Sequence, residues 1–246
     1  MEKTFDLNNL KAIKIELTRF MMAYKFALDE MTTKINILKD EFNYIHDYNP
    51  IEHVNSRVKS PESIFKKVQR KDCDFTLESI KTTIKDIAGM RITCSFISDI
   101  YEISRMIANQ KDIRIIEYKD YIKNPKPNGY QSLHMIVEIP IFMSDREELI
   151  MVEIQIRTIA MDFWASLEHK IYYKYNKEIP QKMLDELKAT AEMAAHLDRK
   201  MEGLHKEMAK MKRADEAEEK FLLPIGTGNN KLKLLETFME EQLGIK

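Results

Sequence analysis

The sequence has few cysteines, almost no net charge and no long apolar run, and each of these narrows the possible function. Its 246 residues carry 39 Lys and Arg against 40 Asp and Glu, a formal net charge of −1. This excludes a global basic field that attracts nucleic acid nonspecifically, so any anion site must be a local cluster. The two cysteines, Cys73 and Cys94, lack the spacing of metal ligands. With no signal peptide and no run long enough to span a bilayer, we expect a cytoplasmic protein without a membrane partner.

The common nucleotide-binding loops are also missing, as is any His or Cys cluster suitable for zinc. Neither GxxxxGKS, GxxxxGKT nor GxGxxG occurs, which argues against a P-loop ATPase and against a dinucleotide enzyme. The composition is otherwise ordinary, with 44% hydrophobic and 32% charged residues. The length suits one substantial domain with helical extensions, or two small domains.

The stretch from Met151 to Arg157 alternates between apolar and polar residues, which predicts a strand. Successive strand side chains point to opposite faces, so one face can pack on a core while the other carries functional groups. The apolar face holds Val152, Ile154 and Ile156, and the polar face holds Glu153, Gln155 and Arg157. On alternation alone, a half-buried antiparallel strand with a solvated polar face is the more common interpretation. A functional interpretation therefore depends on the other segments.

A basic surface is predicted along residues 57–71. Ser60 and Pro61 are typical of an N-cap and a first helical residue, and the helix is expected to run to about Lys71. One helix face carries Ser63, Lys67 and Arg70, the other carries Ile64, Phe65 and Val68, and Arg57 and Lys59 lie in an extended segment upstream. Cations around a helix start suit a polyphosphate, because the helix N-terminus adds its own positive end. A solvated basic face explains this segment equally well when it is taken alone.

Three more strands and two more helices are expected in the middle of the chain. Strands are predicted at 85–96, 113–121 and 131–142, and helices at 98–109 and 159–175. The turn at 124–130 is rigid by composition and presents Lys126 and Tyr130 at the start of the third strand. Ser132 and His134 share one face of that strand.

Two long helices are predicted near the ends of the chain, at 8–47 and 181–213. Each carries apolar residues at heptad spacing. Such a stripe is expected to bury against another helix, in the same chain or in a partner. The chain is accordingly divided into an N-terminal helical region, 1–48, a central domain, 49–178, and a C-terminal helical region for oligomerisation, 179–246.

Asp86 and Glu153 are the two carboxylates on which the chemistry is expected to depend. They lie at the starts or middles of strands that could be neighbours in one sheet. Carboxylates hold Mg²⁺, which bridges and neutralises phosphate oxygens, and either group can polarise an attacking hydroxyl. Facing the basic surface, they predict magnesium-dependent phosphoryl or nucleotidyl transfer. Tyr130, on its stiff loop, is suited to stack on a base.

Five segments carry a resemblance to a known family. They are SRVKSPESIFKK at 56–67, KDIAGMRI at 85–92, KDYI at 119–122, KPNGYQSLH at 126–134 and VEIQIRTIAMDFWASLEHK at 152–170. In this order they resemble the synthetase domain of the RelA/SpoT family, especially its small stand-alone alarmone synthetases, over roughly residues 50–178. The resemblance implies an α+β fold with a mixed, mostly antiparallel, nucleotidyltransferase-like sheet flanked by long N- and C-terminal helices. It also implies a GTP pyrophosphokinase, which uses Mg²⁺ to transfer the β,γ-pyrophosphate of ATP to the 3′-hydroxyl of GTP or GDP.

The same resemblance implies roles for individual residues. Asp86 is expected to bind the metal, and Glu153 to engage both the metal and the 3′-hydroxyl. The expected ATP-binding residues are Arg57, Lys59, Ser63, Lys67, Arg70 and Arg91, with the two arginines Arg57 and Arg91 enclosing adenine. The expected GTP- or GDP-binding residues are Lys119, Lys126, Tyr130, His134, Gln155 and Asp162, with Tyr130 stacking on guanine.

Two positions depart from the pattern of other family members. Glu117 stands where long relatives carry an arginine ahead of Lys119, which leaves the preference between GDP and GTP open. Asp162 stands where some relatives have asparagine. An ionised carboxylate can accept hydrogen bonds from both N1–H and the 2-amino group of guanine, so guanine selection should be kept or sharpened.

Several alternatives stay open at this point. The short segment before the motifs has no His-Asp metal pair, so synthesis without hydrolysis is expected. Small members of the family are homotetramers joined through flanking helices, which would give both heptad patterns a purpose. A first alternative is pyrophosphorylation of the 3′ end of tRNA, although the near-neutral charge disfavours a long RNA. A second is a non-catalytic regulator that binds guanine nucleotides or single-stranded RNA, and RNA binding alongside catalysis is also conceivable.

Overall fold

The computed structural model describes residues 7–46, 48–173 and 179–222. The chain forms two compact units, one up to Glu202 and one from Gly203 onward. Of the second unit, only the end of the last helix is described, so the predicted C-terminal region beyond Leu222 lies outside the described residues. All functional side chains considered below belong to the first unit.

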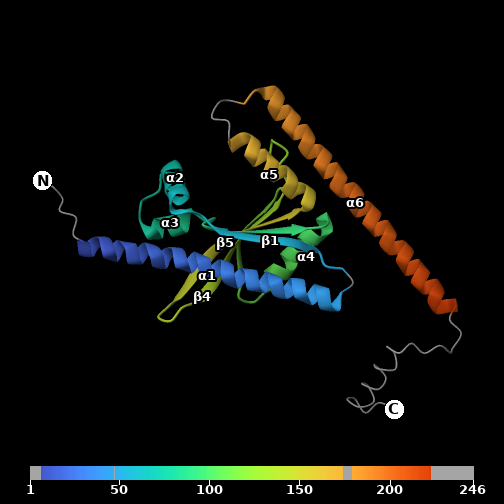
Figure 1. The fold of residues 1–246 in the computed structure, drawn as a ribbon, viewed down its shortest axis with the longest axis horizontal. Coiled ribbons are helices and arrows are strands. Elements are labelled where there is room, and N and C mark those ends of the chain that lie inside the picture. Colours follow the sequence, from blue (N-terminus) through green and yellow to red (C-terminus); the bar gives the residue numbers. More distant parts are fainter. Residues whose placement is uncertain (1–6, 47, 174–178, 223–246) are drawn as a thin grey trace, which may run out of the picture. The chain divides into compact units, whose positions relative to one another are not determined.

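Helices and strands are mixed along the described part of the chain (Figure 1). They are α1 (Leu7–Ile45), β1 (Ile51–Val58), α2 (Pro61–Lys71), α3 (Leu77–Thr83), β2 (Ala88–Cys94), α4 (Ile97–Ala108), β3 (Arg114–Asp120), β4 (Leu133–Phe142), β5 (Glu147–Thr158), α5 (Ile159–Tyr173) and α6 (Gln181–Leu222). The helices and strands predicted in the first unit are confirmed, whereas β1 and α3 were not predicted as a strand and a helix. In β1 only Ile51 is buried, so the strand lacks a clear apolar alternation. The helix α3, with 7 residues, is too short to show helical periodicity.

The five strands form one sheet in the order β1-β2-β5-β4-β3. Only β2 and β5 run parallel, and the other neighbouring pairs are antiparallel. The predicted α+β fold with a mixed, mostly antiparallel sheet is therefore confirmed. The functional strand β5 lies at the centre, with Val152, Ile154 and Ile156 fully buried as the alternation predicted.

The helix α1 packs across this sheet, and the prediction that its apolar stripe buries against another helix is wrong (Figure 1). Tyr24, Met31 and Ile35 of the stripe are buried in the same core as the apolar faces of the strands. An apolar helix stripe fits a sheet face as well as a helix, and the heptad pattern does not distinguish the two. Because α1 covers the apolar face, the opposite face of the sheet is left for polar side chains.

The first half of α6 packs on α5 around the buried Trp164. Its indole nitrogen donates to the Thr190 hydroxyl at 3.0 Å and to the Leu187 carbonyl at 3.3 Å. A second attachment lies where β5 passes into α5, where the Thr158 hydroxyl donates to Asp198 at 2.6 Å. The same hydroxyl oxygen accepts from the backbone N–H of Met161 at 3.1 Å, as an N-cap does.

Replacement of Asp198 by asparagine should stabilise the protein near pH 7.5, by about 1 kcal/mol or roughly 3 °C in Tm. Burial raises the pKa of Asp198, and the charge of Glu202 adds to the rise. The hydrogen bond from Thr158 acts to lower the pKa but does not outweigh burial. The folded state therefore binds the proton of Asp198 more tightly than the unfolded chain does. Protonated Asp198 stabilises the fold at low pH, and this contribution is lost as the pH rises through the folded-state pKa. Asparagine keeps the acceptor without the buried charge. Thermal unfolding at pH 7.5 and near pH 4 checks this, since the gain should vanish at the lower pH; a lower Tm at pH 7.5 would contradict it.

No helix among the described residues combines the length and the apolar character that a membrane span requires. Cys73 and Cys94 are both free thiols, the first half-buried and the second buried.

Candidate active site

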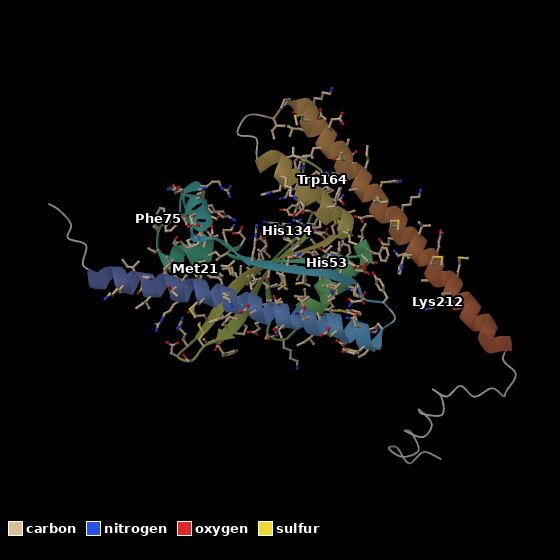
Figure 2. The ribbon with its side chains drawn as sticks, in the orientation of Figure 1. Met21, His53, Phe75, His134, Trp164 and Lys212 are labelled. Carbon is tan, nitrogen blue, oxygen red and sulfur yellow. The ribbon has the colours of Figure 1, made fainter. Side chains whose placement is uncertain are left out.

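The register of the sheet aligns those predicted site residues that lie on strands in two neighbouring rows on the face away from α1. One row runs through Asn55, Arg91, Gln155, His134 and Lys119, and the next runs through Arg57, Gly89, Glu153, Ile136 and Glu117. Residues paired across strands point to the same face. The central strand β5 thus separates the expected ATP side, on β1 and β2, from the expected GTP side, on β4 and β3. His134 lies in the middle of this face, on the side away from α1 (Figure 2).

Asp86 lies in the turn before β2 and is held by two lysines of the basic surface. Its Oδ2 accepts from the Lys59 ammonium at 2.8 Å and from the Lys67 ammonium at 2.6 Å. Burial acts to raise the pKa of Asp86, but the two hydrogen-bonded ammonium groups outweigh it and keep the pKa below its usual range. The carboxylate is therefore ionised at neutral pH.

The other oxygen of Asp86 provides a test of whether the site suits a metal ion. Among the residues that the structure describes, Asp86 Oδ1 is a buried oxygen with no hydrogen-bond partner, an arrangement that needs a ligand or water to satisfy it. No group of three or more His, Cys, Asp or Glu side chains is gathered for a metal in the described part of the chain. Mg²⁺ fits such a sparse site, because it typically takes one or two carboxylates and completes its shell with water and substrate phosphates.

Glu153 lies on β5 and is linked electrostatically to Asp86. The Gln155 side-chain nitrogen donates to Glu153 Oε2 at 3.0 Å, and His134 Nδ1 lies 3.5 Å from Oε1. Burial acts to raise the pKa of Glu153, but His134 and Gln155 outweigh it and lower the pKa overall. The charge of Asp86 also acts to raise the pKa of Glu153, so the two carboxylates are near enough to repel one another, which a cation between them would relieve.

The hydrogen bonds around His134 indicate which of its nitrogens carries the proton. Arg157 donates to the Tyr130 hydroxyl at 2.6 Å, and that hydroxyl lies 2.7 Å from His134 Nε2. The hydroxyl oxygen accepts from Arg157, so its own proton is available for Nε2. Neutral His134 then carries its proton on Nδ1, on the side of Glu153. The chain Arg157–Tyr130–His134 thereby orients a donor toward Glu153.

Arg157 is the main site residue that the sequence did not single out. Its side chain is buried and donates to Ser132, Tyr130, Gln155 and Asp162 at 2.6–3.3 Å. Alternation on the strand had placed Arg157 on the polar face, but an exposed guanidinium would have fitted that pattern as well. A buried Arg with four side-chain partners fixes the acceptor side of the site, since removing it would leave several buried polar groups unpaired.

The acceptor loop, residues 124–130, is packed on α6 through a glycine. Gly129 has φ +87°, and a Cβ atom at this position would lie 2.5 Å from the Ala191 Cβ. The side chain of Asn128 donates to Glu168 of α5 at 3.2 Å. The predicted rigid turn is thus held from both α5 and α6. Tyr130, which follows directly, has the Lys126 ammonium 4.6 Å from its ring centroid.

The remaining predicted residues lie at the edges of the site. Ser60 caps α2, with its hydroxyl oxygen accepting from the Ser63 N–H at 3.3 Å, as predicted. Arg57 and Arg70 are exposed. Lys119 is paired with Glu117 at 2.5 Å, so the departure from the family pattern places a carboxylate directly on an expected phosphate-binding cation.

The apolar face predicted for α2 is partly wrong. Ile64 and Val68 are buried, but Phe65 is 47% exposed and stacks on Phe75, with ring centroids 5.8 Å apart. Phe65 and Ile64 are adjacent, and two neighbouring residues on a helix point about 100° apart, so both cannot face the core equally.

Comparison with known proteins agrees with this arrangement. The model of the region found in RelA/SpoT proteins matches residues 56–178. The chain is 54% identical over 202 residues to the GTP pyrophosphokinase YwaC of Bacillus subtilis, covering 82% of this chain and 96% of that protein. The crystal structure of small alarmone synthetase 2 from Bacillus subtilis superposes with a TM-score of 0.72 at 53% identity, covering 78% of this chain and 99% of that one. That of small alarmone synthetase 1, bound to its product pppGpp, gives 0.73 at 38% identity, covering 78% and 97%. The chain therefore belongs to the RelA/SpoT family.

Proposed function

We propose that the chain is a GTP pyrophosphokinase, which transfers the β,γ-pyrophosphate of ATP to the ribose 3′-hydroxyl of GDP or GTP. The products are ppGpp or pppGpp, and AMP. The observation that carries the proposal is the position of Glu153, in the strand between the expected ATP side and the expected GTP side and within electrostatic range of Asp86. The similarity to YwaC and to the pppGpp-bound synthetase supports the choice of substrates.

The donor side is suited to hold the triphosphate of ATP. Lys59, which precedes α2, and Lys67, in its second turn, both donate to Asp86. Ser63 lies at the helix N-terminus, where backbone N–H groups and the helix dipole favour anions. Asp86 and Glu153 would hold Mg²⁺, which would neutralise phosphate oxygens. Arg57 and Arg91 lie diagonally across β1 and β2, since Arg57 pairs with Gly89 and Arg91 with Asn55, and they are proposed to enclose adenine.

Glu153 is suited to accept the proton of the attacking hydroxyl. Its lowered pKa keeps it ionised at neutral pH, and His134 fixes the orientation of the carboxylate. As the 3′-oxygen bonds to the β-phosphorus of ATP, the bond from that phosphorus to the α-phosphate oxygen breaks, and AMP leaves with the electron pair. The hydroxyl proton passes to Glu153. Orientation of both nucleotides on one rigid sheet face supplies the proximity that the step requires.

One assay tests the proposal against its alternatives. The purified chain is mixed with ATP and Mg²⁺, and with GDP, GTP or tRNA in separate reactions. AMP and a guanosine 3′-diphosphate should form with GDP and with GTP. Product only with tRNA would establish the RNA acceptor instead, and nucleotide binding without turnover would establish a non-catalytic regulator.

Asp162 is proposed to select guanine. Replacement of Asp162 by alanine should lower the preference for GDP over ADP as the pyrophosphate acceptor by about 10- to 100-fold. The N1–H and 2-amino groups of guanine would lose the carboxylate to which they donate. The ratio of kcat/KM for GDP and ADP as acceptors measures this. An unchanged ratio in the alanine variant would show that another group reads the base.

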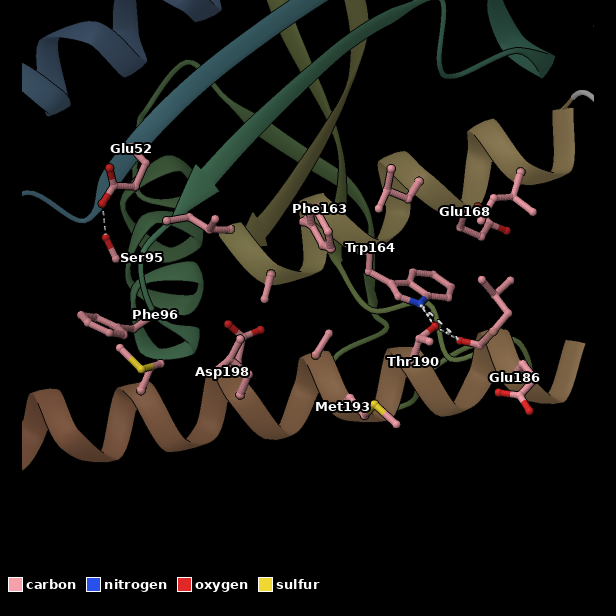
Figure 3. Close-up of a pocket in the computed structure, with 18 of the residues that line it drawn as sticks. Glu52, Ser95, Phe96, Phe163, Trp164, Glu168, Glu186, Thr190, Met193 and Asp198 are labelled. Atoms are coloured by element: carbon pink, nitrogen blue, oxygen red, sulfur yellow. Dashed lines mark hydrogen bonds between the residues drawn. The ribbon is translucent and has the colours of Figure 1, made fainter. Parts of the chain in front are cut away.

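We propose that the protein is a homotetramer, because an apolar groove lies between α5 and the first half of α6 (Figure 3). The groove has a volume of about 1080 Å³ and is lined mainly by apolar side chains. Its exposed apolar members include Phe163, Leu167 and Ile171 on α5 and Met193, Leu197 and Met201 on α6. Exposed apolar surface on this scale is typical of an interface. Light scattering should give the mass of four chains, and the mass of a single chain would contradict the proposal.

A further inference from the structure

A single carboxylate oxygen connects the two nucleotide sides of the candidate active site. Asp162, in the first turn of α5, forms an ion pair through Oδ1 with Arg91 of β2 at 3.0 Å and accepts a hydrogen bond at the same oxygen from Arg157 of β5 at 3.2 Å. Arg91 is a candidate for the adenine side. Arg157 is bonded to Tyr130 on the guanine side. Asp162 therefore touches both sides at once.

The two arginines are held very differently. Arg157 is 4% exposed and donates also to Ser132, Tyr130 and Gln155. The Arg91 side chain is 35% exposed, and its buried Nε has no hydrogen-bond partner among the described residues. A partly exposed single ion pair contributes little, whereas a buried guanidinium with four partners is costly to displace. Arg91 is thus the one of the two that can leave Asp162.

Guanine and the two arginines compete for the carboxylate oxygens of Asp162. Oδ1 of Asp162 accepts a hydrogen bond from Arg157, and the Arg91 guanidinium lies 3.0 Å from the same oxygen. The N1–H and 2-amino groups of guanine form a parallel pair of donors that requires both oxygens of a carboxylate. Guanine therefore competes with Arg91 for Oδ1, since Arg157 is fixed.

We propose, resting on the function proposed above, that Asp162 is a positioning residue that makes the donor and the acceptor bind cooperatively. Guanine displaces Arg91 from Asp162, and the released Arg91 becomes free to lie on adenine. In the reverse order, adenine draws Arg91 away and uncovers the carboxylate for guanine. Because coupling between two binding sites is reciprocal, each nucleotide strengthens the other by the same factor, about two- to fivefold for an ion pair of this exposure.

The coupling can be measured without turnover. Calorimetry gives the Kd of α,β-methylene ATP with Mg²⁺, with and without saturating GDP, and the Kd of GDP with and without the analogue. In the native chain both Kd values should fall two- to fivefold when the other nucleotide is present. In Asp162→Asn, which keeps the shape but not the charge, the analogue alone should bind two- to fivefold more tightly than to the native chain, and GDP should no longer tighten it.

If the role of Asp162 were merely structural, its replacement would weaken the binding of the ATP analogue. Tighter binding of the analogue to Asp162→Asn therefore distinguishes the proposed role from a structural one. Glu138→Gln is the matched control, because Glu138 also pairs with an arginine, Arg114, but on the β3–β4 side away from the site. It should show native coupling. Unchanged or weaker analogue binding in Asp162→Asn, or native coupling in that variant, would overturn the inference. Normal synthesis of ppGpp without any coupling would overturn it while leaving the proposed function intact, and absence of nucleotide binding would overturn both.

Discussion

Replacement of Glu153 by glutamine should lower the rate of pyrophosphate transfer by at least about 100-fold. Glutamine has nearly the same shape and can keep a contact with Gln155 and His134, but it cannot accept the proton of the 3′-hydroxyl and is a weak ligand for Mg²⁺. The loss should therefore appear in kcat, while the Kd of GDP changes little. The formation of AMP from ATP and GDP under single-turnover conditions measures the chemical step.

The Glu153→Gln variant should be slightly less stable than the native chain at neutral pH, because the lowered pKa of Glu153 means that the ionised carboxylate stabilises the folded state. Glu138→Gln is again the matched control, since it neutralises a carboxylate of the neighbouring strand outside the site and should keep native activity. A Glu153→Gln variant that retains more than about a tenth of the native kcat would rule out Glu153 as the proton acceptor.

Replacement of Gly129 by alanine should raise the KM for GDP by about 10- to 100-fold and leave the Kd of ATP nearly unchanged. The backbone at φ +87° is strained for alanine, and the new Cβ would lie 2.5 Å from the Ala191 Cβ. The acceptor loop must then move away from α6 and take Tyr130 with it. Initial rates at varied GDP, together with calorimetry of α,β-methylene ATP, measure the two effects.

A second substitution distinguishes the two causes of this loss. Ala191→Gly removes the atom that the new side chain would strike, so the double variant Gly129→Ala with Ala191→Gly should recover part of the GDP affinity. The backbone strain stays, so recovery should be incomplete. The control Ala191→Gly alone should cost about 1 kcal/mol of stability as a helix glycine without raising the KM for GDP. Equal loss of ATP binding in Gly129→Ala would mean that the loop does not act on the acceptor alone.

The local chemistry of the site could be predicted from the sequence, because it depends on short-range patterns. Alternation placed Glu153 and Gln155 on the face opposite Val152 and Ile154, and the structure has them there. The cap at Ser60 and the start of α2 followed from two residues whose backbone preferences are strong. The family resemblance added the roles, which neither pattern nor spacing could supply.

Contacts between distant segments could not be predicted in this way. The pairing of Arg91 with Gln155, and of Gln155 with His134, depends on the register of three strands. Register is set by the packing of the whole sheet. For the same reason, no pattern in the sequence indicates that Asp162 meets Arg91 or that Gly129 lies against Ala191. The helix α1 was assigned the wrong kind of partner because an amphipathic stripe specifies that a face is buried and not what covers it.

The fate of the phosphates of ATP tests the central claim most directly. The chain is incubated with Mg²⁺, GDP and ATP labelled at the γ-phosphate, and the labelled product is identified together with the unlabelled adenine nucleotide. Pyrophosphate transfer predicts label in a guanosine 5′-diphosphate 3′-diphosphate and one AMP for each molecule of it. Release of ADP with transfer of a single phosphate, or label only in inorganic phosphate, would contradict the claim.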